Sequence, residues 1–112
     1  MTDSILDTAR LAELAEEVGA DDLRFVLDMF LDEVAEAVRT LDPALAAEPY
    51  AKRMHFVRSG ALNLGLAGLA AEARRQAALP DGERAGAGPA LATAMERARE
   101  ALDGHLEARP AA

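Results

Sequence analysis

The residues of this chain with the clearest chemical potential begin at His55, the first of its two histidines. A cation, Arg58, and a small hydroxyl residue, Ser59, follow it at helical spacing. Because residues three and four apart share one face of a helix, these side chains are predicted to lie together. A neutral imidazole is available near neutral pH, since its unperturbed pKa is about 6.5. The set suits an imidazole that holds a phosphoryl group while a partner approaches it.

The opposite side of the same helix is predicted to face the protein interior. A helical wheel with His55 as origin groups four residues on that side: Val57, Gly60, Ala61 and Leu64. Gly65 is expected to break the helix, and Asn63 to bond nearby backbone as a helix-end residue. The imidazole should therefore point away from the core.

Helical periodicity and capping residues extend through the first half of the chain. Asp7 or Thr8 is expected to cap a short first helix that Gly19 ends. Asp21 is expected to cap a second helix, which Pro43 should end or kink. The apolar stripe of this second helix is predicted to centre on Leu23, Phe30 and Leu41.

The second half of the chain shows the same pattern. A third helix is predicted over about 49–64 with Pro49 in its first turn, and a fourth over about 66–79. A Gly-rich loop should run from Pro80 to Gly88, before a last helix that Pro89 starts. The inward residues expected on these last two helices are Leu66, Leu69, Ala70, Ala73 and Ala77, then Leu91, Met95, Ala98, Leu102 and Leu106.

Four long helices with short connections predict an all-α fold. We expect an antiparallel up-and-down four-helix bundle with a short additional N-terminal helix packed on one end. The chain of 112 residues should form one domain over 1–112, with a core of about 5–108 and a frayed tail over 109–112. Because aromatic residues make up only 4% of the chain, packed helices are favoured over sheets.

Composition and charge exclude several classes of protein. The formal net charge of −8 argues against binding nucleic acid or anionic membranes, both of which favour basic surfaces. The chain has no cysteine, and its acidic second helix lacks the Glu-x-x-His pairs of a carboxylate metal site. Those acids are therefore expected to form a solvated face. With neither a signal peptide nor a membrane-spanning stretch in the sequence, a cytoplasmic location is expected.

The stretch 53–69 resembles the signature of histidine phosphotransfer (HPt) domains of multistep phosphorelays, in outline His-x-Leu-Lys-Gly-Ser-(small)-x-x-(apolar)-Gly. His55 takes the phosphorylated position, Val57 the apolar one and Arg58 the basic one. A frequent family ending, Ala-Gly-Asn-Leu-Gly, is matched by Ala61, Asn63, Leu64 and Gly65. The chain departs from the family pattern in three ways: Ser59-Gly60 inverts the usual Gly-Ser order, Arg58 replaces the commoner Lys, and Leu62 is bulkier than the usual residue. Residues 27–34 also resemble the second helix of that family.

The resemblance implies a phosphoryl carrier without kinase activity of its own, and therefore not an enzyme. Its partners would be response-regulator receiver domains and a sensor or hybrid histidine kinase. The receiver would supply Mg²⁺, so no cofactor is expected on this chain. His55 would be nucleophile and leaving group, Arg58 would offset phosphoryl charge, and Ser59 and Gly60 would add no bulk.

A receiver would also need an apolar surface around the histidine. Phe25 and Met29 lie off the core axis of the second helix, and Leu62 lies two turns after His55 on its outer face. We expect these three residues, together with Ser59 and Gly60, to dock the receiver. Phe25 packing under the first helix and Met29 at an inter-helix seam is the alternative interpretation.

Two other functions stay open at this point. One is a non-phosphorylated HPt-like module that only binds or scaffolds other proteins. The other is a helical oligomerisation domain, whereas the phosphotransfer hypothesis expects a monomer. The chain is expected to be a free-standing module, with a fragment of a hybrid kinase as the other possibility. The second histidine, His105, has no cation one turn on and is expected to be solvated.

Overall fold

The computed structural model describes residues 5–42 and 44–107, and over these ranges the chain contains helices and no strand, which confirms the all-α prediction. The elements are α1 (Thr8–Val18), α2 (Ala20–Arg39), α3 (Ala47–Asn63), α4 (Ala67–Ala77), the short 3-10 helix η2 (Asp81–Gly86) and α5 (Ala87–Glu107). Pro43 and the tail 109–112, for which a helix stop and fraying were predicted, lie outside the described residues.

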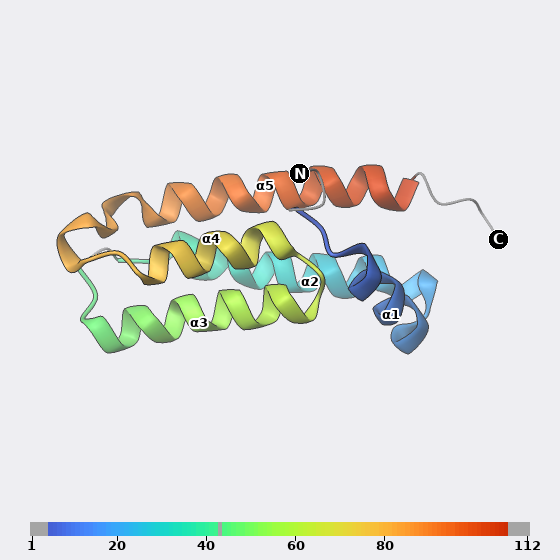
Figure 1. Cartoon of the computed structure of the whole chain (residues 1–112), viewed down its shortest axis with the longest axis horizontal. Helices are drawn as coiled ribbons and strands as arrows, with labels where there is room; N and C mark the ends of the chain where they lie inside the picture. The colour runs from blue at the N-terminus through green and yellow to red at the C-terminus, as the bar shows by residue number, and fades with distance from the viewer. Residues whose placement is uncertain (1–4, 43, 108–112) are drawn as a thin grey trace.

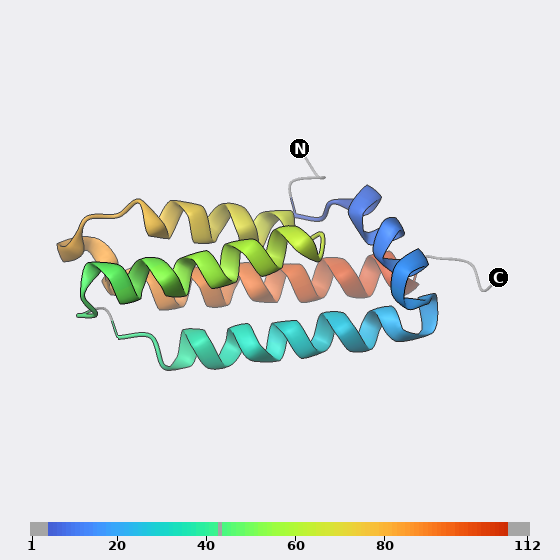
Figure 2. The same ribbon diagram turned by 90° about the horizontal axis from the view of Figure 1, so that it is seen from below.

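Four helices run lengthwise beside one another. The chain colours in Figures 1 and 2 show that α2, α3, α4 and α5 alternate in direction, while α1 lies at the end where α2 begins. Contacts join α2 to α3, α3 to α4, α4 to α5 and α5 back to α2. The arrangement is elongated, with extents of 50 × 26 × 18 Å. Each of these four helices therefore has one face toward a shared interior and one face outward.

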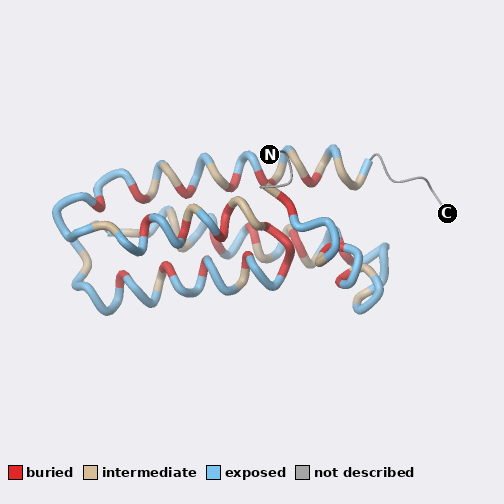
Figure 3. Tube along the Cα trace, in the orientation of Figure 1, coloured by how far each residue is buried: buried red, intermediate tan, exposed pale blue. Residues whose placement is uncertain are grey.

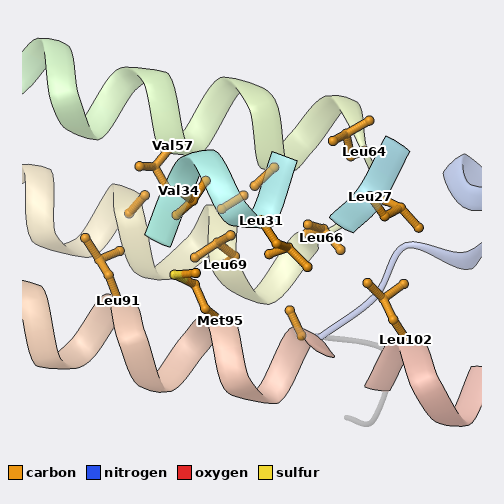
Figure 4. Close-up of a cluster of buried hydrophobic side chains, with 14 of the residues drawn as sticks. Leu27, Leu31, Val34, Val57, Leu64, Leu66, Leu69, Leu91, Met95 and Leu102 are labelled. Atoms are coloured by element: carbon orange, nitrogen blue, oxygen red, sulfur yellow. The ribbon is translucent and has the colours of Figure 1, made fainter. Parts of the chain in front are cut away.

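The interior is built mainly from leucine, valine and alanine. Figure 3 shows buried positions recurring along one side of each helix, and Figure 4 shows Leu31, Val57 and Leu69 pointing into the same space from three helices. Burying one such aliphatic side chain stabilises a protein by roughly 1.5–3 kcal/mol. The buried residues of α2 are Leu23, Leu27, Leu31 and Val34. Phe30 and Leu41, predicted at the centre of this stripe, are only half-buried, so that part of the prediction is wrong.

Gly19 joins the first two helices. It ends α1 with a φ of +91°, a left-handed value that glycine adopts readily, and its N–H donates to the carbonyl of Ala15. The same residue stands at the N-cap of α2, so the predicted Asp21 cap is wrong. Asp21 lies instead in the first turn, where its charge suits the helix dipole. The predicted cap of α1 is confirmed, because Asp7 accepts a bond from the N–H of Arg10 at 3.1 Å.

The stretch predicted as a Gly-rich loop is helical instead. It forms η2, and α5 begins at Ala87, two residues before the predicted start at Pro89. The physical reason is Arg84, whose guanidinium is buried 4.1 Å above the ring of Tyr50 and donates to the carbonyl of Leu45 at 3.5 Å. Anchoring that side chain holds the backbone around it in one short helical turn.

Two smaller corrections concern α4. It ends at Ala77, two residues before the predicted end, and Ala77 is exposed rather than inward. Gln76 takes the inward place, and its carbonyl accepts a hydrogen bond of 2.9 Å from the buried Tyr50 hydroxyl. Burial raises the pKa of that hydroxyl above its ordinary value.

The acids of α2 are more than a solvated face, because two of them connect α2 to α5. Arg99 of α5 approaches Asp32 at 3.3 Å and Asp28 at 3.9 Å, and Arg24 bridges Asp28 and Asp103. Exposed pairs of this kind contribute about 0–1 kcal/mol each. Among the described helices, none has both the length and the apolar content that crossing a bilayer requires.

The N-terminal segment is fastened to the turn between α3 and α4. Arg10 donates to the carbonyl of Asn63 at 2.7 Å and to its side-chain oxygen at 3.1 Å, and the N–H of Asp7 donates to the carbonyl of Gly65 at 2.8 Å. Gly65 ends α3 as predicted, with a φ of +77°. A Cβ on Gly65 would lie 2.9 Å from Leu11, so only glycine fits this turn without displacement.

Candidate functional site

The α3 helix presents His55 to solvent midway along its length. Met54 and Val57, on either side of it in the sequence, are buried, whereas Arg58 and Ser59 are exposed beside the imidazole. The predicted orientation of this helix is therefore confirmed for His55, Val57, Arg58 and Ser59, while their chemical roles stay predictions.

An open groove lies beside His55, between α2 and α3. Its volume is about 820 Å³, and it is lined by Phe30 of α2 and by Glu48, Ala51, Lys52, His55, Phe56, Ser59 and Gly60 of α3. The rings of Phe30 and Phe56 pack against each other with centroids 6.0 Å apart and planes tilted by 48°. The imidazole thus stands at the edge of a mainly apolar surface that could accept a partner.

Gly60 allows the Phe30 ring to lie against α3. A Cβ at this position would be 2.2 Å from Cε1 and 2.5 Å from Cζ of that ring. Gly60 was predicted on the side of the wheel opposite His55, and this is wrong, because it lines the same groove as the imidazole. The cause is its angular position on α3, between the interior and the outer face, where it meets α2.

Two cations flank the imidazole at one helical turn. Arg58 follows His55 by three residues, and Lys52 precedes it by the same spacing. Lys52 lines the groove, whereas Arg58 lies on the other flank of the histidine. Among residues 5–42 and 44–107, neither has an ion-pair partner, so both charges face solvent near the imidazole. Lys52 was missed in the sequence, although its three-residue spacing from His55 could have indicated it.

The hydroxyl of Ser59 contacts the imidazole itself. Its Oγ lies 3.2 Å from Nε2 of His55, within hydrogen-bond distance and one turn along the same helix face. The Ser59 side chain therefore contacts the imidazole directly, a feature that its small size alone did not predict. The nitrogen it contacts, Nε2, is the ring nitrogen farther from the backbone.

The predicted docking residues divide into two sets. Ser59 and Gly60 lie in the groove with His55. Phe25, Met29 and Leu62 do not line it, although they are 65%, 50% and 53% exposed. The alternative that Phe25 packs under α1 is therefore wrong.

The two aromatic residues that do line the groove were not predicted as site residues. Phe56 directly follows His55 in the sequence and is 41% exposed. Phe30 was assigned to the core because a flank residue of an apolar stripe has the same periodicity as a core residue. A large exposed apolar residue next to the histidine was the available signal for Phe56.

Outside this region the described residues offer little competing chemistry. His105 is half-buried on α5 rather than solvated as predicted, and it does not join the groove. Over residues 5–42 and 44–107, no three histidine, cysteine or carboxylate side chains gather in a way that could hold a metal. The chain matches no family model, no curated protein and no solved structure. A functional proposal therefore rests on the geometry around His55.

Proposed function

We propose that this chain is a histidine phosphotransfer protein that accepts a phosphoryl group on His55 and passes it to or from the aspartate of a response-regulator receiver domain. The observation that carries the proposal is an exposed imidazole midway along α3, at the edge of an apolar groove, with Lys52 and Arg58 one turn to either side. In this proposal α2 to α5 constitute an antiparallel four-helix bundle, and α1 covers one end.

The chemistry needs little from this chain beyond access. The lone pair of a neutral imidazole nitrogen attacks the phosphorus of an aspartyl phosphate, the N–P bond forms, and the P–O bond breaks with its electrons leaving on the carboxylate. No separate base is required, because the attacking nitrogen carries no proton. The receiver brings Mg²⁺ and its own catalytic groups, while Arg58 and Lys52 offset the charge on the phosphoryl oxygens.

Docking must bring the receiver's aspartate to bonding distance from His55. Small residues next to the imidazole, Ser59 and Ala51, leave room for that approach, and both line the groove. The exposed edges of Phe30 and Phe56 supply apolar surface for this contact. Burying such surface against a partner stabilises the complex by roughly 25 cal/mol per Å². In this proposal the groove contacts the receiver first, and Phe25 and Met29 extend the contact along α2.

The deciding experiment uses receivers from the same genome, charged with acetyl phosphate and incubated with the whole protein. We expect acid-labile phosphate on the wild type, none on His55→Gln, and normal acceptance by His105→Gln as the matched control. Circular dichroism should show that both variants keep their helices, since His55 is exposed and His105 is only half-buried. Phosphate retained by His55→Gln and lost from His105→Gln would refute the assignment.

A helical binding or oligomerisation module is the second candidate. The observation in its favour is that Phe25 and Met29 are large, apolar and exposed but do not line the groove beside His55. Light scattering separates the two functions. A tight dimer that buries the His55 face, and that Phe25→Ser with Met29→Ser dissociates, would support this candidate, whereas a phosphate-accepting monomer would support the first.

A further inference from the structure

The contact between Ser59 and His55 bears on which ring nitrogen carries the proton, as well as on the position of the ring. Within the described residues, the Ser59 hydroxyl makes a single hydrogen bond, the one of 3.2 Å to Nε2 of His55. A hydroxyl carries one proton to donate, and a neutral imidazole has one nitrogen that accepts and one that donates. When Ser59 donates, Nε2 must be the nitrogen without a proton, and the proton of the ring must be on Nδ1.

We propose that Ser59 is a positioning residue that holds His55 in the Nδ1–H tautomer and afterwards donates the same hydrogen bond to the phosphoryl group on Nε2. This inference rests on the proposed phosphotransfer function. It gives Ser59 a chemical role in addition to the room that its small side chain leaves for a receiver. In the resting protein the hydroxyl selects the reactive nitrogen. In the phosphorylated protein it stabilises the product.

The tautomer decides which nitrogen can react. Only a nitrogen with a free lone pair attacks phosphorus, and in the Nε2–H tautomer that nitrogen would be Nδ1, next to the ring carbon that joins the side chain to the backbone. An incoming receiver reaches the outer nitrogen more easily. The fraction of molecules with the proton on Nδ1 is therefore the fraction ready for transfer.

Every bond and proton of the transfer step is accounted for. The Nε2 lone pair forms the N–P bond, the aspartyl P–O bond breaks toward the carboxylate, and the Nδ1 proton stays in place. The Ser59 hydroxyl keeps its own proton throughout and only changes acceptor, from Nε2 to a phosphoryl oxygen. That change requires a rotation about χ1 between staggered positions, which is open to an exposed side chain.

Other groups near the imidazole leave this choice to Ser59. Lys52 and Arg58 carry donor groups only, and over residues 5–42 and 44–107 neither makes a hydrogen bond to His55. Glu48, the one carboxylate lining the described groove, makes no hydrogen bond to His55 there. Within the described part of the chain, Ser59 is thus the sole side chain in position to bias the tautomer.

The first test needs no phosphate. Nitrogen-15 NMR of the whole unphosphorylated protein, above the titration range of imidazole, reports which nitrogen of His55 carries the proton. We expect Nδ1–H to dominate in the wild type and in Ser59→Thr, which keeps the hydroxyl. In Ser59→Ala the ratio of the two tautomers should shift toward Nε2–H by roughly two- to tenfold, the effect of one hydrogen bond. An unchanged ratio in Ser59→Ala would overturn the inference.

The second test follows the product. Each protein is phosphorylated with potassium phosphoramidate, and the loss of phosphohistidine is timed. The lifetime should fall roughly two- to tenfold in Ser59→Ala and recover in Ser59→Thr, because one hydrogen bond to the phosphoryl group is lost and restored. Equal lifetimes in all three proteins would overturn the product half of the inference.

The two tests also distinguish failure of this inference from failure of the proposed phosphotransfer function. A wild type that accepts no phosphate from phosphoramidate or from receivers would refute both the proposed function and the product half, whatever the tautomer. A wild type that accepts phosphate normally, with a tautomer that Ser59→Ala does not change, would leave the function standing and refute the role of Ser59. Alanine is a strong helix former at this exposed position, so the variant should stay folded.

Discussion

Replacing Gly60 with alanine should disturb the groove beside His55 without any change at the histidine itself. The new Cβ would overlap the Phe30 ring at 2.2 Å, and an ordinary contact begins near 3.4 Å, so the edge of the ring must retreat by about 1.2 Å. The ring packs on Phe56 with centroids 6.0 Å apart, and this pairing weakens as the ring moves outward. Adding one methyl group at position 60 should therefore weaken the packing of Phe30 against Phe56.

The change in the free energy of unfolding is the sum of one stabilising term and two destabilising terms. Alanine in place of a mid-helix glycine stabilises a helix by roughly 0.5–1 kcal/mol. Weakening the Phe30–Phe56 pair costs about 0.5–1.5 kcal/mol, and forcing the ring off its rotamer costs a further 0.5–1.5 kcal/mol or so. We expect Gly60→Ala to lower the free energy of unfolding by up to about 2.5 kcal/mol.

The chain offers a matched control in Gly104. It stands three residues before the end of α5, as Gly60 stands three before the end of α3, and a Cβ there meets no atom within 4 Å. Urea unfolding should show Gly104→Ala to be more stable than the wild type by about 0.5–1 kcal/mol. In a Phe30→Ala background, Gly60→Ala should become stabilising as well. If Gly60→Ala alone is as stable as Gly104→Ala, the packing argument for the groove is refuted.

Three further predictions concern Arg58 and Ser59 beside His55 and the carboxylate of Glu72 on α4. Arg58→Ala should slow phosphoryl transfer or shorten the phosphohistidine lifetime by the equivalent of about 1–3 kcal/mol at most, with little change in Tm; an unaltered rate and lifetime would make it an ordinary surface cation. Ser59→Trp should stay folded but fail to exchange phosphate with a receiver, and normal exchange would show that the partner binds elsewhere. The hydrogen bond from Arg75 holds the pKa of Glu72 below its ordinary value, so this carboxylate stabilises the fold above a pH of about 4.3 and loses that contribution as pH falls through the lower, folded value. Stability measured against pH should therefore fall in acid less steeply for Glu72→Gln than for the wild type, and parallel curves would contradict the assignment.

Helix positions could be predicted from the sequence because their signals are local. Periodicity placed α2 and α5 within a few residues, and the stops at Gly19 and Gly65 follow from backbone values that glycine adopts readily. The short helix η2 could not be predicted in this way. It depends on Arg84 reaching Tyr50, a contact across 34 positions of the chain that no local pattern contains.

In the candidate site, too, local features could be predicted and contacts between helices could not. The exposure of His55 and its neighbours on α3 follows from a helical wheel, because they share one element. The groove does not, since it requires the ring of Phe30 on α2 to meet Gly60 on α3. Periodicity alone gives Phe30 the appearance of a core residue, and only the packing of two helices shows that it lines a surface.

The attachment of α1 to the α3–α4 turn has a consequence for local unfolding. Arg10 and Asp7 hold the backbone of Asn63 and Gly65, so α1 cannot lift away while that turn keeps its hydrogen bonds. Segments joined in this way open together, as one cooperative unit. In native-state hydrogen exchange, the amide of Asp7 and those of the turn should share one protection free energy. Weakening these hydrogen bonds would loosen the last turn of α3, the helix that carries His55, well before the molecule unfolds as a whole.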